Sequence, residues 1–169
     1  MEDCLHQVDF KTKYKADDSL DKLQVARDFT QRPGVDFDET YAPTALLTTI
    51  HTIFSPVAHF GWPIFQMDVK SANLNGHLDK GVYVEQPPGF KVPGKEDWVY
   101  RLLKALYELK QAGRQWYLTL DHFLLKLELW CTLTDSDCYV VSHGSLVAIM
   151  IVHVDDLIFT CSWKSLIQS

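Results

Sequence analysis

Residues 149–159 read IMIVHVDDLIF, in which the adjacent carboxylates of Asp155 and Asp156 separate two apolar runs. Apolar runs of this length are typical of strands, so the pair lies where a hairpin would turn. Two neighbouring anions repel each other, and such a site often titrates abnormally or binds a cation. The motif alone also fits a solvated Asp-Asp turn, and only the rest of the chain can decide between a turn and a metal site.

Composition limits the class of protein. The chain has 169 residues, of which 47% are hydrophobic and 22% charged, which is typical of one globular domain with a sizeable core. Its formal net charge is -6, whereas proteins that follow a phosphate backbone are usually basic, so strong autonomous binding of nucleic acid is disfavoured. The four cysteines and seven histidines show no zinc-ligand spacing, and we interpret the cysteines as reduced thiols.

The sequence contains no segment that predicts a membrane span or a leader. The longest apolar run, 146–152, is far shorter than the roughly 20 residues that a spanning helix needs. The N-terminus lacks both the basic and the apolar region of a signal peptide. We therefore expect an intracellular protein without a membrane partner; its compartment and oligomeric state are not indicated.

Hydrophobic periodicity predicts a mixed set of helices and strands. Apolar residues at helical spacing indicate a helix over 45–60, with Thr44 as its cap. Pro56 should break or kink the last turns of this helix, since an interior proline costs ~3 kcal/mol. The other expected elements are a hairpin (8–15 and 20–30), a strand at 62–69, a short helix at 70–75, strands at 82–84 and 98–103, a helix over 111–129, and a hairpin of 137–141 and 146–152 that leads into the aspartate pair.

This order of elements predicts an α+β fold, with an antiparallel sheet and helices packed on one face. The strand that ends at Asp68 and the hairpin that carries Asp155 and Asp156 can then meet at one rim. Three converging carboxylates suit two divalent cations about 3.5–4 Å apart, as in phosphoryl transfer. Magnesium is the expected ion because it prefers oxygen ligands. Asp68 and Asp155 are the expected direct ligands, and Asp156 is a ligand or a neighbouring group.

Six stretches of the chain are similar, in this order, to the reverse transcriptase domain of copia-type long-terminal-repeat retrotransposons. They are VARDFTQ (25–31), DETYAP (38–43), QMDVKSA (66–72), YVEQPPGF (83–90), LLKALYELKQAGRQW (102–116) and HVDD (153–156). The similarity extends over about residues 8–161. It implies a fingers-palm polymerase fold, with a fingers-like part at 8–43, a palm with the remaining fingers elements at 44–162, and the thumb missing.

The resemblance also implies the roles of individual residues. Asp68, Asp155 and Asp156 match the catalytic aspartates that hold two magnesium or manganese ions for nucleotidyl transfer. The implied partners are an RNA or DNA template-primer and deoxynucleoside triphosphates. The residues implied to lie against the nucleotide are Val69, Lys70, Ser71, Ala72 and Asn73, and those implied to line the nucleotide and template side are Tyr107, Lys110 and Arg114.

Several positions depart from the family pattern. Leu23 and Gln24 stand where relatives carry a basic run, and Asp18 and Asp28 stand at glycine positions. Asn73 stands where the family has an aromatic residue that excludes ribonucleotides. Glu108 occupies a further glycine position, and His153 replaces the tyrosine before the aspartate pair. Together these changes predict that the isolated chain is weakly active or inactive.

Three functions therefore remain open. The first is a reverse transcriptase fragment, an RNA-directed DNA polymerase domain. The second is a catalytically dead remnant or a co-opted, non-enzymatic binding or scaffold module. The third, a small metal-dependent phosphodiesterase that uses the same carboxylates, is disfavoured because no separate general base is apparent.

Overall fold

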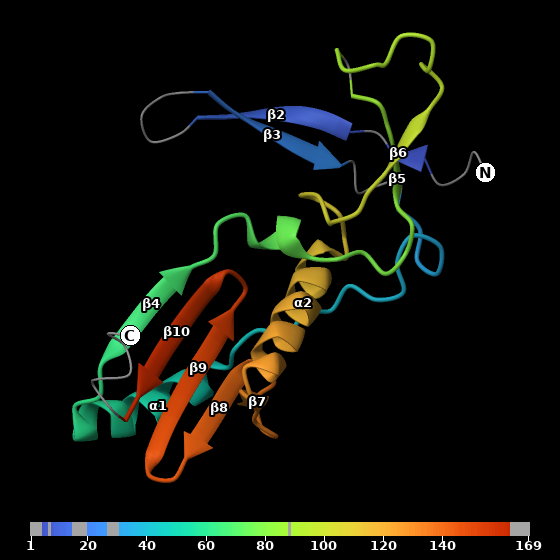
Figure 1. Cartoon of the computed structure of the whole chain (residues 1–169). Coiled ribbons are helices and arrows are strands. Elements are labelled where there is room, and N and C mark those ends of the chain that lie inside the picture. Colours follow the sequence, from blue (N-terminus) through green and yellow to red (C-terminus); the bar gives the residue numbers. More distant parts are fainter. Residues whose placement is uncertain (1–4, 7, 15–19, 27–30, 88, 163–169) are drawn as a thin grey trace. The chain divides into compact units, whose positions relative to one another are not determined.

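The structure, a computed structural model, describes residues 5–6, 8–14, 20–26, 31–87 and 89–162 (Figure 1). The chain forms two compact units, here called unit 1 and unit 2. Unit 1 comprises Met1–Tyr41 and Asn73–Leu118, and unit 2 comprises Ala42–Ala72 and Thr119–Ser169. The described elements combine helices with runs of consecutive strands, which confirms the expected mixed α+β class.

Unit 2 is built on a five-stranded sheet with the strand order β4-β10-β9-β8-β7 (Figure 1). Every neighbouring pair is antiparallel, as predicted. The strands are β4 (Ile64–Asp68), β7 (Trp130–Cys131), β8 (Cys138–His143), β9 (Leu146–His153) and β10 (Asp156–Cys161). Strands β8, β9 and β10 are consecutive hairpins because their apolar runs are separated by tight turns, the first containing Gly144 at a φ of 63°.

Helix α1 (Leu47–Phe60) begins two residues later than the predicted helix (45–60) and ends at the predicted residue. Its N-cap is Leu46 rather than Thr44, and no side chain of the capping residue bonds to the helix. Instead the carboxylate of Asp135 accepts a hydrogen bond from the Leu46 N–H at 3.0 Å. The helix also continues through Pro56, because Val57 is buried in the core and Gly61 closes the C-terminus with a bond to the Val57 carbonyl.

The register of the sheet shows how the two helices of the chain contact it. Alternation places Cys138, Val140 and Ile149 on one face, where they and α1 line an open cavity of about 390 Å³. Tyr139 alternates to the other face, and its hydroxyl donates to Asp121 of α2 (Ala112–Lys126) at 2.8 Å. The helices therefore contact residues on opposite faces, which differs from the expected packing on one face.

Unit 1 contains two small sheets. Strands β2 (Val8–Tyr14) and β3 (Leu20–Ala26) form the antiparallel hairpin expected from the sequence. The second sheet has the order β1-β5-β6, with β1 parallel to β5 and β5 antiparallel to β6. Its strands are β1 (Leu5–His6), β5 (Tyr83–Glu85) and β6 (Val99–Arg101).

The core of unit 1 lies where β5 approaches the start of α2. Val82, Ala105, Leu109 and Ala112 are buried together there. Gly76 lies against the same helix, and a Cβ at this position would be 2.6 Å from the backbone nitrogen of Trp116. Since ordinary side chains never approach this closely, the contact requires glycine.

Candidate functional site

Asp68 and Asp156 lie directly opposite each other on neighbouring strands. Asp68 ends β4, Asp156 begins β10, and the two residues are partners in the antiparallel register. Asp156 is also the partner of His153, the last residue of β9. Because directly opposite residues point to the same face with Cβ atoms about 4.5–5.5 Å apart, the three side chains form one row across three strands.

Asp155 lies in the turn that joins β9 to β10. The turn residue before it, Val154, has a φ of 59°, which is uncommon for a β-branched side chain. The Val69 N–H donates to the Asp155 carbonyl at 2.9 Å, so the turn is tied to the end of β4. The structure thus brings Asp68, Asp155 and Asp156 to one rim of the unit 2 sheet, as the sequence predicted.

The environment of the three aspartates is open and polar. Asp68 and Asp155 are exposed, and Asp156 is half-buried. The Gln66 side-chain amide donates to Asp156 Oδ1 at 3.1 Å, a partner that the sequence did not indicate. Among the described residues, no group of three or more Asp, Glu, His or Cys side chains is arranged to hold a metal ion. The chemistry of the donors still fits a divalent cation, because exposed carboxylates on adjacent strands supply hard oxygen ligands.

The segment after Asp68, implied to lie against a nucleotide, runs into the short 3-10 helix η3 (Ala72–Asn75). Lys70 is exposed, Val69 is half-buried and Ala72 is buried. Ser71 has a φ of 55°, a left-handed conformation that is uncommon for residues other than glycine. Asn73 belongs to unit 1, and its Oδ1 atom is buried with no hydrogen-bond partner among the described residues.

The other residues implied at the nucleotide side, Tyr107, Lys110 and Arg114, belong to unit 1. Tyr107 is half-buried, and the Lys110 ammonium lies 5.9 Å from the centre of the Phe37 ring. Arg114 is already engaged: its guanidinium is 3.0 Å from Glu39 and donates to the Tyr41 carbonyl at 2.9 Å. Arg114 therefore holds the segment around Glu39 in this structure.

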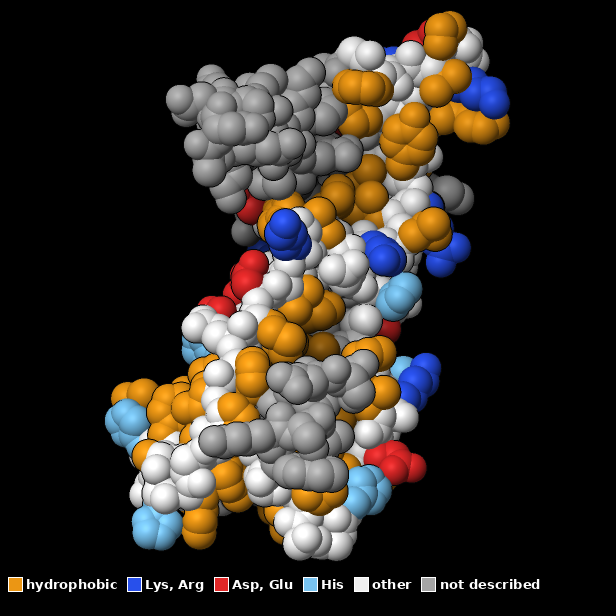
Figure 2. Space-filling model, turned by 60° about the vertical axis from the view of Figure 1, so that its left-hand side comes forward, with side chains coloured by type: hydrophobic (Ala, Val, Ile, Leu, Met, Phe, Trp, Pro, Cys, Tyr) orange, Lys and Arg blue, Asp and Glu red, His pale blue; other side chains and the backbone are white. Residues whose placement is uncertain are grey.

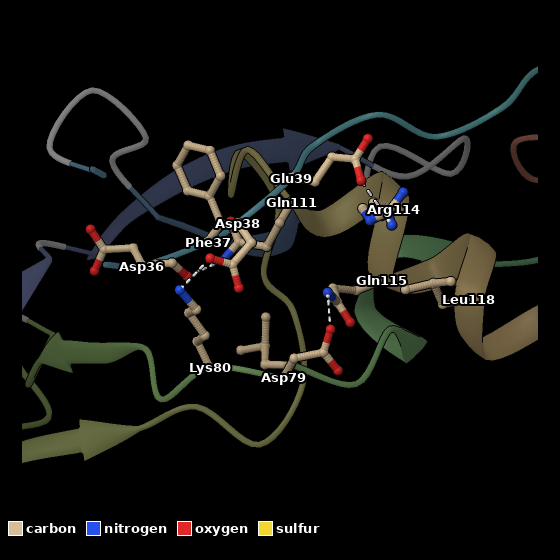
Figure 3. Close-up of a pocket in the computed structure, with 11 residues that line it drawn as sticks. Asp36, Phe37, Asp38, Glu39, Asp79, Lys80, Gln111, Arg114, Gln115 and Leu118 are labelled. Atoms are coloured by element: carbon tan, nitrogen blue, oxygen red, sulfur yellow. Dashed lines mark hydrogen bonds and ion pairs between the residues drawn. The ribbon is translucent and has the colours of Figure 1, made fainter. Parts of the chain in front are cut away.

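Arg114 also lines a cavity of about 250 Å³ within unit 1 (Figure 3). Charged and polar side chains around this cavity form ion pairs and hydrogen bonds with one another. Lys80 pairs with Asp38 at 2.6 Å, and the Gln115 amide donates to Asp79 at 2.9 Å. The cavity is therefore lined by groups that satisfy each other, and Figure 3 shows the Lys80 and Arg114 side chains directed at their carboxylate partners.

Two glutamines hold this region together, and the only sign of them in the sequence is that each lies in a similar stretch, Gln31 in 25–31 and Gln111 in 102–116. Gln31 and Gln111 are buried and joined by a side-chain hydrogen bond of 2.9 Å. Gln31 also accepts a bond from the Lys110 N–H, while the Gln111 amide donates to the Asp36 carbonyl. Buried amides of this kind fix segments that are distant in sequence.

Two of the sequence departures have a structural counterpart. Glu108, at the position where the family carries glycine, has a φ of 66°, in the region that favours glycine. His153 lies in the row beside Asp156. Leu23 and Gln24 lie in β3, and Asp18 and Asp28 fall outside the described residues.

Comparison with known proteins gives a consistent result. Residues 5–169 match the family described as reverse transcriptase (RNA-dependent DNA polymerase). The chain is 37% identical over 163 residues to the retrovirus-related Pol polyprotein from transposon RE1 of Arabidopsis thaliana. It is 39% identical over 163 residues to the retrovirus-related Pol polyprotein from transposon TNT 1-94 of Nicotiana tabacum. No solved structure matches the chain.

The matches cover most of this chain and little of the relatives. They span 95% of the chain and 11% of the Arabidopsis polyprotein, and 94% of the chain and 12% of the tobacco polyprotein. The Ty1-H Gag-Pol polyprotein of Saccharomyces cerevisiae is 33% identical over 103 residues, which are 58% of the chain and 6% of that relative. The chain thus corresponds to a small part of each polyprotein.

Proposed function

Because the chain belongs to the reverse transcriptase (RNA-dependent DNA polymerase) family, as a domain fragment from copia-type retrotransposon Pol polyproteins, we propose that its three aspartates are polymerase catalytic groups. Asp68, Asp155 and Asp156 serve nucleotidyl transfer from a deoxynucleoside triphosphate to a primer 3′-hydroxyl on an RNA or DNA template. The observation that carries the proposal is the row in which Asp68 faces Asp156, with Asp155 in the adjoining turn.

The three carboxylates are the groups that would hold two magnesium or manganese ions. A metal pair supplies charge stabilisation for the attacking and leaving oxygens of the phosphoryl transfer. The protein's own contribution is to position the carboxylates. Gln66 orients Asp156 through its amide, and the Val69 N–H holds the Asp155 turn against β4.

The nucleotide and template contacts are separate expectations for each residue. Val69, Lys70, Ser71, Ala72 and Asn73 would face the incoming triphosphate. Tyr107, Lys110 and Arg114 would line the nucleotide and template side. On the same basis we propose a fingers-like part at 8–43 of this chain and a palm with further fingers elements at 44–162.

Within the described residues neither helix is long and apolar enough to cross a membrane.

A second candidate, a non-enzymatic binding or scaffold module, is favoured by one observation. The cations Arg114 and Lys80, which line the cavity in unit 1, are paired with Glu39 and Asp38. A phosphate would have to displace these carboxylates before it could bind the same cations. With a net charge of -6 the chain as a whole also repels a polyanion. Both points agree with the expectation that the isolated chain is weakly active or inactive.

Primer extension on an RNA template, with magnesium or manganese, separates the two candidates. Asp155→Asn should abolish any extension, whereas Asp97→Asn, which removes a carboxylate from an exposed position of unit 1, should leave it unchanged. Extension that survives Asp155→Asn would overturn the proposed catalytic role.

A triple variant, Asn73→Phe, Glu108→Gly and His153→Tyr, tests the origin of low activity. If only this variant extends the primer, the departures from the family pattern silence the chain. If it also fails to extend and magnesium gives it no thermal stabilisation, the scaffold function is supported, because ligand binding to the folded state must raise its stability.

A further inference from the structure

Asp137, which precedes β8 in unit 2, is a buried acid that the proposed polymerase site does not use. Its side chain is 1% exposed. Neither carboxylate oxygen has a hydrogen-bond partner among the residues that the structure describes. A buried carboxylate without a partner is strongly unfavourable when ionised, so the group must be neutral or must gain a partner.

The backbone of Asp137 connects two elements of unit 2. Its N–H donates to Asp135 Oδ1 at 3.1 Å, and its carbonyl accepts from the Val152 N–H at 2.8 Å. The other oxygen of Asp135 accepts from the Leu46 N–H at the start of α1. The loop 132–138 thus joins the N-terminus of α1 to β9, the strand that leads into the aspartate turn.

The titratable groups around Asp137 favour its neutral form. Burial raises the pKa of Asp137 to about 6, and the charge of Asp135 acts in the same direction, while His153 at the end of β9 opposes both. Burial alone would raise the pKa of Asp135, but hydrogen bonds from Thr49, Leu46 and Asp137 lower it below its usual value. Asp121 of α2 accepts a hydrogen bond from the Tyr139 hydroxyl of β8.

The two acids of the loop therefore have different roles. Asp135 is hydrogen-bonded and remains charged at the positive end of α1, where an anion is stabilising. Asp137, two residues later, has no such partners among the described residues, and a charge on it would be repelled by the charge of Asp135. A proton on Asp137 removes both the repulsion and the buried charge.

We propose that Asp137 is a proton-operated lock on the loop 132–138. With its proton bound, the loop stays closed between α1 and β9. When the proton leaves, the carboxylate has to reach water, and the loop opens by releasing the bond between the Asp137 carbonyl and the Val152 N–H. The lock goes beyond polymerase function, since it would operate whether or not the aspartate row is active.

Hydrogen exchange of the Val152 amide in the whole chain tests the lock. Exchange is measured at about pH 5 and about pH 7.5 and corrected for the intrinsic effect of pH. If the pKa of Asp137 is about 6 in the closed loop and about 4 in the open loop, opening should be about tenfold more frequent at the higher pH. Asp137→Asn, an isosteric neutral variant, should show equal opening at both values. Equal opening in the unaltered chain would overturn the proposal.

Two further measurements keep the test decisive. In His153→Gln the pH dependence should persist, and its disappearance would show that His153 rather than Asp137 controls the loop. Millimolar magnesium at about pH 7.5 should not restore protection in Asp155→Asn, which lacks one of the proposed metal-binding carboxylates; if it does, the Asp137 carboxylate binds a cation and the proton lock is wrong. Should Asp137→Asn fail to fold, the pH profile of the unaltered chain still decides, because it must follow a single proton with a midpoint near 6.

Discussion

The two units of this chain use charged side chains in different ways. At the rim of unit 2, Asp68 and Asp156 lie opposite each other on neighbouring strands. In the described part of the chain neither of them takes part in an ion pair. In unit 1, Lys80 and Arg114 are paired with carboxylates of the same unit. Figure 2 shows Lys and Arg side chains beside hydrophobic side chains on the face that it presents.

The acids at the rim of unit 2 are available to a ligand, whereas the cations of unit 1 already have carboxylate partners. Unpaired acids retain their attraction for a cation, whereas paired ions mainly hold their own loops in place. Unit 2 therefore carries acids that remain available to a cation, and unit 1 carries the ion pairs that favour the second candidate function. Perturbing each unit separately sharpens this contrast.

The largest effect is expected in unit 1 from Gly76→Ala. The added Cβ would lie 2.6 Å from a backbone atom of α2, which cannot move as a flexible side chain would. We expect the free energy of unfolding to fall by about 3 kcal/mol, measured by urea denaturation. Gly94→Ala is the matched control, since nothing lies within 4 Å of its Cβ and only its φ of 75° is unfavourable. A loss below about 1 kcal/mol would show that the contact relaxes.

The next effect concerns Asp137 in unit 2. Its folded pKa of about 6 lies above the usual 3.8, so the folded chain binds more protons between these values. The free energy of unfolding therefore falls as the pH rises from about 4 to about 6, by about 2–3 kcal/mol in total. Asp137→Asn should lack this fall. The difference between the two stability-pH curves measures it, and parallel curves would contradict the expected contribution of Asp137.

A smaller loss is expected from Asp135→Ala, again in unit 2. The variant removes the acceptor of the Leu46 N–H and the negative charge beside the start of α1. Loss of a helix cap costs about 1–2 kcal/mol, which thermal unfolding followed by circular dichroism can detect. Thr44→Ala is the control, because the sequence predicts Thr44 as the cap and the structure does not. A larger loss for Thr44→Ala would reverse the assignment.

The smallest effect, a gain, is expected in unit 1 from Glu108→Gly. Glycine adopts a φ of 66° without the strain that a side chain brings, so the variant should be more stable by about 1 kcal/mol. Glu108→Ala separates the causes, because it removes the charge but keeps the backbone strain. If alanine stabilises as much as glycine, the charge of Glu108 rather than its backbone is unfavourable.

The local patterns of the sequence predicted the part of the fold that depends on near neighbours. The strands that flank Asp155 and Asp156 are continuous apolar runs with short turns, and they form β9 and β10 as expected. Asp68 lies at a strand end, as its place after an apolar run indicated. Alternation and turn length determine where each carboxylate lies on its own strand or turn, whereas the pairing of β4 with β10 that brings Asp68 opposite Asp156 joins residues distant in sequence.

Contacts between distant residues could not be predicted in the same way. The cap of α1 comes from Asp135, 89 residues away, so Thr44 was the nearest polar residue but not the acceptor. Pro56 was expected to break or kink the last turns of α1, yet the helix continues through it to Phe60, where the burial of Val57 and the Gly61 cap outweigh its local cost. The parallel pairing of β1 with β5 has no signature in a two-residue strand. The burial of Asp137 likewise depends on elements that only the folded chain assembles.

The strand order of unit 2 has a consequence for how the chain folds. Strands β8, β9 and β10 are joined by tight turns, and such hairpins form quickly because little chain entropy is lost. Strand β4 is different, since Gln66 and Asp156, which bond across the β4–β10 edge, are 90 residues apart. Pairing of β4 with β10 has to wait until α2 and strands β7 to β10 have been synthesised. We expect the aspartate row to be among the last features of unit 2 to form, so that a folding intermediate can contain the hairpins while Asp68 is still unpaired.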